Sequence, residues 1–111
     1  MDVVLSVLIV AVMGGLGSTI RYLIGSWQSL LPWGILLANS IASFIAGLAV
    51  GEGLFELALI AGFAGGLSTF STFAAQTLDL WTTRSKALAL LNGVLNLVLP
   101  TVLFITALFL L

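Results

Sequence analysis

Apolar residues fill almost the whole chain, and the few charged residues divide it into four long stretches. The uncharged runs are Val3 to Ile20, Tyr22 to Gly51, Leu57 to Leu78 and Ala87 to Leu111. Each is long enough to cross a hydrocarbon core of about 30 Å, which takes about 20 helical residues. The pattern predicts an all-α membrane protein, with one domain over residues 1–111 and four transmembrane helices at approximately 3–22, 32–51, 57–79 and 86–110.

Composition narrows the possible functions. The chain is 61% hydrophobic and 6% charged, with a mean hydropathy of +1.32, so we expect the lipid bilayer to surround it. With neither Cys nor His, it is a poor candidate for a disulfide framework or a transition-metal site. A net charge of −1 without a basic cluster argues against a nucleic-acid partner.

The third run is interrupted by the segment GFAGGLSTFSTF, residues 62–73. The pair Gly65-Gly66 and the hydroxyl residues after it weaken a helix, and carbonyls freed at a break need partners inside the bilayer. A cation or a neighbouring chain can supply them, which predicts a break in the third helix beside a buried site. The alternative is that these glycines only let helices approach closely.

Uncharged polar side chains lie within the predicted spans, notably Asn39, Ser43, the hydroxyl cluster of residues 68–72, Gln76, Asn92 and Asn96. They either hydrogen-bond neighbouring helices or form a pathway. No Asp, Glu, Lys or Arg lies deep in a span, which argues against a proton-coupled or cation-coupled exporter. Arg21, near the end of the first helix, is either an interfacial anchor or a functional residue.

The segment GFAGGLSTFSTF resembles the third-helix signature of the Fluc (CrcB) fluoride channels. Other residues that carry the resemblance are Gly14-Gly15, Gly17 and Arg21-Tyr22 in the first helix, and Asn39, Ser43-Phe44 and Gly47 in the second. The likeness covers the first three helices in order and spacing, and it is weak in the fourth. It implies a passive ion channel, not an enzyme, in the plasma membrane of a prokaryote.

The resemblance also implies an antiparallel, dual-orientation dimer with two narrow fluoride pathways along its interface. The edges of the Phe70 and Phe73 rings would face the ion, and Asn39 would donate to it. The remaining candidates are Ser43, Ser71 and Thr72 along the pathway, Arg21 at the vestibule, and the backbone carbonyls of Gly65 and Ser68 as ligands of a central, structural sodium ion.

The chemistry of these residue types suits fluoride independently of the resemblance. Fluoride is small and strongly hydrated, so a pathway must offer donors in place of water without a fixed charge that would trap the ion. Hydroxyl and amide groups meet that requirement. A phenyl ring has a positive edge, which offers a mild electropositive contact. Ordinary packing is the alternative role of Phe70 and Phe73.

The chain departs from the family pattern at two positions and in the fourth helix. Ile35 stands where the resemblance leads us to expect a threonine, and Gln76 where an acidic residue is common. The fourth helix has no tyrosine and presents Asn92, Asn96 and Pro100. These differences leave open what the fourth helix contributes to conduction.

Two other functions fit the size of the chain. A small multidrug-resistance-type proton-coupled exporter has the same length and four helices, but it needs a glutamate in the first helix, and Val3 to Ile20 contains none. A non-conducting partner subunit or assembly factor is the other alternative. A measurement of fluoride flux distinguishes the three functions. A channel conducts without a proton gradient, an exchanger needs the gradient, and a scaffold gives no flux.

Charge placement predicts the orientation. Four helices put the basic residues Arg21, Arg84 and Lys86 on one side, and the acidic residues Asp2, Glu52 and Glu56 on the other. Basic residues near helix ends face the cytoplasm, so both termini should lie outside. A chain that inserts both ways to form an antiparallel homodimer should have little charge bias, and this chain has a clear one. We therefore expect a heterodimer with a homologous, oppositely inserted chain, with a dual-topology homodimer as the alternative.

Overall fold

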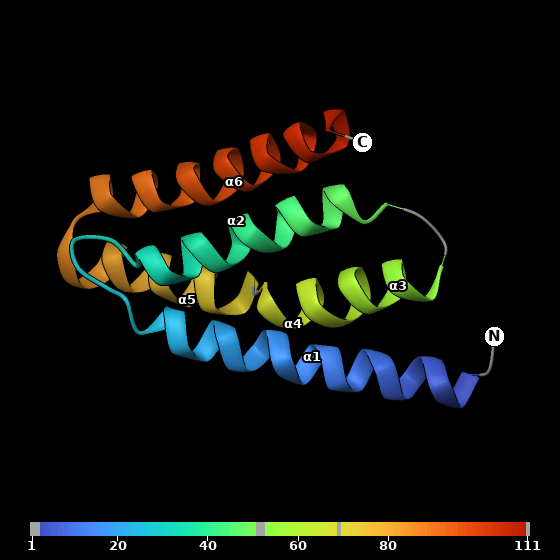
Figure 1. Cartoon of the computed structure of the whole chain (residues 1–111). Helices are drawn as coiled ribbons and strands as arrows, with labels where there is room; N and C mark the ends of the chain where they lie inside the picture. The colour runs from blue at the N-terminus through green and yellow to red at the C-terminus, as the bar shows by residue number, and fades with distance from the viewer. Residues whose placement is uncertain (1–2, 51–52, 69, 111) are drawn as a thin grey trace.

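The computed structural model describes residues 3–50, 53–68 and 70–110, and the regular structure in these ranges is all helical (Figure 1). The elements are α1 (Val3–Gly25), α2 (Trp33–Leu48), a broken third helix, and α6 (Lys86–Phe109). The third helix consists of α3 (Leu54–Leu57), the π-helical η1 (Ala58–Ala64), α4 (Gly65–Leu67), α5 (Phe70–Asp79) and the π-helical η2 (Leu80–Arg84). The all-α prediction is confirmed.

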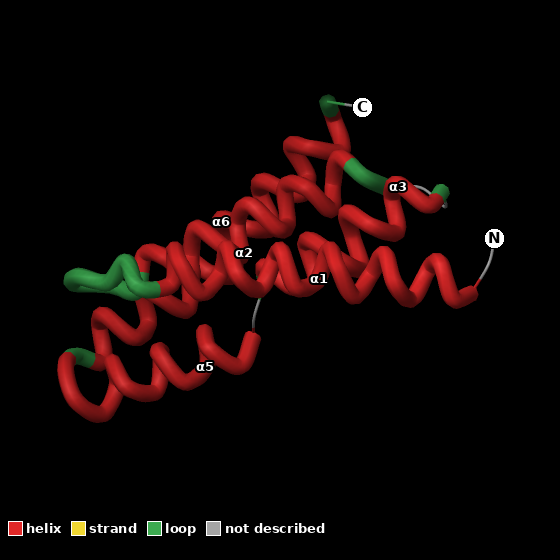
Figure 2. Tube along the Cα trace, turned by 60° about the horizontal axis from the view of Figure 1, so that its bottom comes forward, coloured by secondary structure: helices red, strands yellow, loops and turns green. Residues whose placement is uncertain are grey.

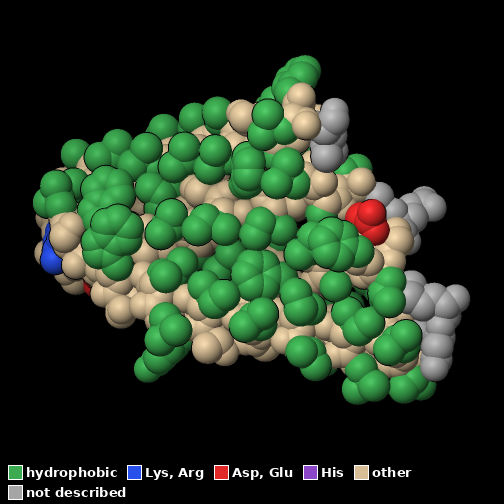
Figure 3. Space-filling view, in the orientation of Figure 1, with side chains coloured by type: hydrophobic (Ala, Val, Ile, Leu, Met, Phe, Trp, Pro, Cys, Tyr) green, Lys and Arg blue, Asp and Glu red, His purple; other side chains and the backbone are tan. Residues whose placement is uncertain are grey.

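The outer surface is that of a multi-pass membrane protein. Three helical segments are long and apolar enough to cross a bilayer: α1, Leu54–Arg84 and α6. At 16 residues, α2 is shorter than expected and spans about 24 Å. Large apolar side chains cover the face seen in Figure 3, and charged side chains appear only toward its ends. Asp2 and Glu52, two of the acidic residues used to predict the orientation, lie outside the described residues, as does Thr69 of the hydroxyl cluster.

Small residues set how closely the helices pack. α2 packs along α6, and α1 packs along η1 and α4. A Cβ atom added at Gly17 would collide with the Phe63 carbonyl, and one added at Gly66 would collide with the Gly14 carbonyl. Glycine is therefore required at both helix crossings, because the backbones touch without intervening side chains. This contact holds α1 against the segment that precedes the break.

The third helix breaks at Ser68, within the segment where the sequence predicts an interruption. Ser68 is extended, with φ −79° and ψ 152°, and its N–H donates to the Ala64 carbonyl at 3.0 Å. Beyond it, α5 begins at Phe70 and lies to the side of the rest of the bundle in Figure 2. The Gly66 carbonyl accepts a hydrogen bond from Ser18 Oγ of α1 at 3.4 Å. A neighbouring helix thus satisfies one carbonyl beside the break.

Candidate functional site

Beside the break, α2, α5 and α6 surround an open groove of about 490 Å³. We call it the phenylalanine groove; it is lined by Asn39, Ser43, Ser68, Phe70, Phe73, Gly93, Asn96, Leu97 and Pro100. The structure therefore brings together four of the predicted pathway residues, Asn39, Ser43, Phe70 and Phe73, with the predicted sodium ligand Ser68. Charged side chains are absent from this lining.

The two phenylalanines form the aromatic part of the groove. Their ring centroids are 5.7 Å apart and their planes are tilted by 59°. Phe73 is half-buried, whereas Phe70 is 80% exposed. A tilted pair presents ring edges as well as faces, and ring edges carry the positive end of the quadrupole. The exposed ring of Phe70 leaves one side of the groove without a protein wall.

An uninterrupted series of hydrogen bonds leads from the polar side chains of the groove into the bundle. Asn39 Nδ2 donates to Asn96 Oδ1 at 3.2 Å, and Asn96 Nδ2 donates to Asn92 Oδ1 at 3.1 Å. Asn92 Nδ2 donates to Thr77 Oγ1 at 2.9 Å, which donates to the Phe73 carbonyl at 2.9 Å. We call these four side chains the amide ladder. It connects α2, α6 and α5 across the bundle.

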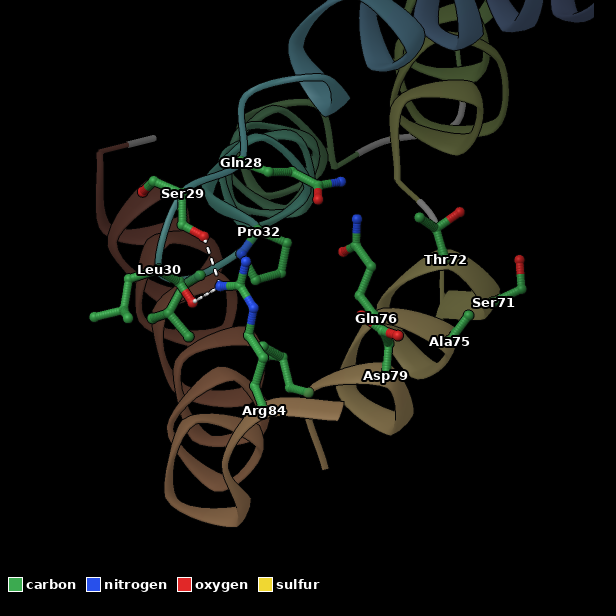
Figure 4. Close-up of a pocket in the computed structure, with 12 residues that line it drawn as sticks. Gln28, Ser29, Leu30, Pro32, Ser71, Thr72, Ala75, Gln76, Asp79 and Arg84 are labelled. Atoms are coloured by element: carbon green, nitrogen blue, oxygen red, sulfur yellow. Dashed lines mark hydrogen bonds between the residues drawn. The ribbon is translucent and has the colours of Figure 1, made fainter. Parts of the chain in front are cut away.

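Ser71 and Thr72 line a different cavity, at the η2 end of the molecule. This cavity, of about 650 Å³, also contains Gln76, Asp79 and Arg84 (Figure 4). Arg84 Nη1 donates to the carbonyls of Ser29 at 3.0 Å and Leu30 at 3.3 Å, which ties the η2 turn to the loop between α1 and α2. The structure thus separates Ser71 and Thr72 from the phenylalanine groove, and their place on a fluoride pathway stays a prediction.

Arg21 lies in a third groove, which adjoins Thr72 and Gln76. Arg21 Nε and Gln76 Oε1 are buried and have no hydrogen-bond partner within the described part of the chain. Ile35, which replaces the expected threonine, is buried and also lines this groove. Buried polar atoms are normally satisfied, so these two atoms mark a place where a further polar group can bind. The place of Arg21 at a vestibule stays a prediction.

The two predicted sodium ligands lie on either side of the break. Gly65 and Ser68 are both exposed residues. Among the described residues, no three or more Asp, Glu, His or Cys side chains could hold a metal ion together. A cation in this region would therefore depend on backbone carbonyls. Sodium is a hard cation, and carbonyl oxygens suit hard cations.

One member of the amide ladder was not indicated by the sequence. Thr77 was not among the candidates, although its hydroxyl is the last side chain of the amide ladder. The only sequence signal for it is its position four residues after Phe73, which is typical of a hydroxyl that bonds to a carbonyl one turn earlier. Asn92 and Asn96 do share one helical face, as their spacing predicts.

Comparison with known proteins identifies the family. Residues 8–108 match the family described as "CrcB-like protein, Camphor Resistance (CrcB)". The chain is 39% identical over 104 residues to "Fluoride-specific ion channel FluC" of Bordetella petrii, covering 85% of this chain and 81% of the relative. It is 41% identical over 110 residues to the protein of the same name from Pyrococcus abyssi, covering 88% and 89%. The chain belongs to the CrcB-like family.

Proposed function

We propose that this chain is a subunit of a fluoride channel, which lets cytoplasmic fluoride leave the cell by passive electrodiffusion. The observation that carries the proposal is the phenylalanine groove, whose lining combines the rings of Phe70 and Phe73 with the carboxamides of Asn39 and Asn96 and contains no charged side chain. Ring edges and amide N–H groups can replace water around a small anion, and the absence of fixed charge lets the ion leave. The names of the relatives agree with this chemistry.

The groove needs a second subunit to become a pore. It is open on one side, where Phe70 is 80% exposed. An antiparallel partner whose broken helix crosses this one would close the groove and create an equivalent one on its own side. It would also bring a second pair of Gly65 and Ser68 carbonyls to the first pair. Four carbonyls can bind one sodium ion on the dimer axis, whereas two alone are few for such an ion.

The placement of charge favours a heterodimer. Arg21 lies near the end of α1, and Arg84 and Lys86 lie at the η2–α6 turn, which the contacts of Arg84 join to the loop after α1. These are the three basic residues of the chain, so one orientation in the plasma membrane of a prokaryote is favoured. A homologous chain inserted the other way would then complete the dimer, with the dual-topology homodimer as the alternative.

Flux measurements test this proposal. The purified chain is reconstituted into liposomes loaded with fluoride, alone and together with a homologous chain from the same cell, and efflux is recorded with a fluoride electrode. We expect efflux that requires a potassium ionophore for charge balance and no proton gradient. Efflux that depends on a proton gradient would indicate an exchanger. The absence of efflux from both preparations would contradict the proposal.

A further inference from the structure

The amide ladder has a fixed direction, which follows from the chemistry of its last member. The Phe73 carbonyl can only accept a hydrogen bond, so Thr77 donates its single hydroxyl proton to that carbonyl. The Thr77 oxygen is then left to accept a hydrogen bond from Asn92. Asn92 must therefore turn Nδ2 toward Thr77 and Oδ1 toward Asn96. The same reasoning continues along the ladder, because each carboxamide has one donating and one accepting end.

Asn96 is oriented by two contacts to Asn92. Its Nδ2 donates to Asn92 Oδ1 and also to the Asn92 backbone carbonyl, at 3.0 Å, and a backbone carbonyl can only accept. The Oδ1 of Asn96 is therefore left for Asn39, whose Nδ2 donates to it at 3.2 Å. Consequently the amide nitrogen of Asn39, and not its oxygen, faces α6 across the phenylalanine groove.

We infer that Thr77 and Asn92 are positioning residues, which set the donor polarity of the phenylalanine groove through the amide ladder. The inference rests on the proposed fluoride function. Asn92 is 1% exposed, and neither it nor Thr77 lines the groove, so they act on the ion only through Asn96 and Asn39. If the Asn92 carboxamide turned over, its Nδ2 would face Asn96 Nδ2, donor against donor, and would oppose the bond of Asn96 to the Asn92 backbone carbonyl. Asn96 would then turn its oxygen toward the groove part of the time, and an oxygen lone pair repels an anion.

The ladder also neutralises an acceptor within the groove. Asn96 lines the groove, and its Oδ1 would be exposed to the ion if Asn39 did not donate to it. Pro100, which lies one turn later on α6, has no N–H to donate to the Asn96 backbone carbonyl, so this carbonyl lacks its helical donor and is a second acceptor at Asn96. Holding Asn96 Oδ1 against an amide nitrogen removes one of them from the path of the anion.

Thr77→Val tests the inference, since it removes the hydroxyl but keeps the shape of the side chain. We expect fluoride flux at least tenfold slower than that of the wild type in the assembly that conducts. Thr77→Ser, which keeps the hydroxyl, should restore flux to within twofold. Thr106→Val is the matched control, because Thr106 makes the same kind of bond to the carbonyl one turn earlier on an exposed part of α6. Its flux should be unchanged.

A spectroscopic measurement distinguishes positioning from general loss of structure. The sequence contains only three asparagines, so labelling with ¹⁵N-asparagine gives three side-chain amide signals. Thr77→Val should shift the signals of Asn39 and Asn96 as well as that of Asn92, and Thr106→Val should shift none. A change confined to Asn92, or wild-type flux in Thr77→Val, would overturn the inference and leave the proposed function intact. A wild-type channel without fluoride flux would overturn the proposed function itself.

Discussion

The rings of Phe70 and Phe73 lie side by side at the start of α5, with centroids 5.7 Å apart and planes tilted by 59°. They follow directly from the break at Ser68, because α5 begins at Phe70 and its first turn carries both rings. The break therefore decides where these rings point. An uninterrupted helix would continue the direction of α4 and carry them elsewhere.

Replacing either ring tests its contact with the ion. Phe70→Ile and Phe73→Ile each keep most of the apolar volume but lose the positive ring edge, so we expect at least a tenfold loss of fluoride flux with assembly intact. The control is Phe109→Ile at the far end of α6, where the ring is 85% exposed. Fluoride efflux measures conduction, and the elution volume in size-exclusion chromatography shows whether the assembly is intact. Unchanged flux in both groove variants would refute the role of these rings.

Sodium removal tests the proposed cation site. If carbonyls of Gly65 and Ser68 bind sodium between two subunits, replacing sodium by N-methylglucamine at constant ionic strength should weaken the dimer, because an ion that binds only the assembled state stabilises it. We expect the monomer fraction to rise and fluoride flux to fall at least tenfold. Restoring sodium should reverse both effects. A dimer that stays intact and active after exhaustive removal of sodium would count against a structural ion.

Labelling of single cysteines tests the orientation. The chain has no cysteine, so Thr83→Cys at the exposed η2 end and Val50→Cys beyond the other end of α2 are unambiguous positions. An impermeant thiol reagent applied to intact cells should label Val50→Cys and spare Thr83→Cys, because basic residues hold the η2 turn in the cytoplasm. Labelling of about half the molecules at both positions would instead mean dual insertion.

Gly17→Ala tests the close contact that holds α1 against the break. The added methyl group would collide with the Phe63 carbonyl, so we expect a loss of about 1–3 kcal/mol in stability. Gly15→Ala on the same helix is the matched control, since its methyl group meets nothing within 4 Å. Thermal unfolding of the two purified variants provides the comparison. Equal melting temperatures would show that the crossing tolerates a side chain.

Much of the architecture can be predicted from local sequence. Long apolar runs can satisfy their backbone polar groups in lipid only as helices, so the helical segments and their approximate order follow from hydropathy. The break follows as well, because Gly65-Gly66 and the hydroxyl residues after it weaken the third helix. The ends of the helices do not follow from hydropathy alone. α2 ends at Leu48 and α1 continues to Gly25, because caps and packing decide the last turn.

The tertiary structure decided which polar side chains meet. Asn39 and Asn96 are 57 residues apart in the chain, and their contact depends on how α2 and α6 are rotated against each other. Thr77 gave almost no signal in the sequence, yet it ends the amide ladder. Ser71 and Thr72 belong to the same motif as Phe70 and Phe73 but line another cavity, since neighbouring positions on a helix point in different directions. Hydropathy along the chain sets where helices form, whereas hydrogen-bond partners between helices depend on rotation and depth, which only the packed bundle determines.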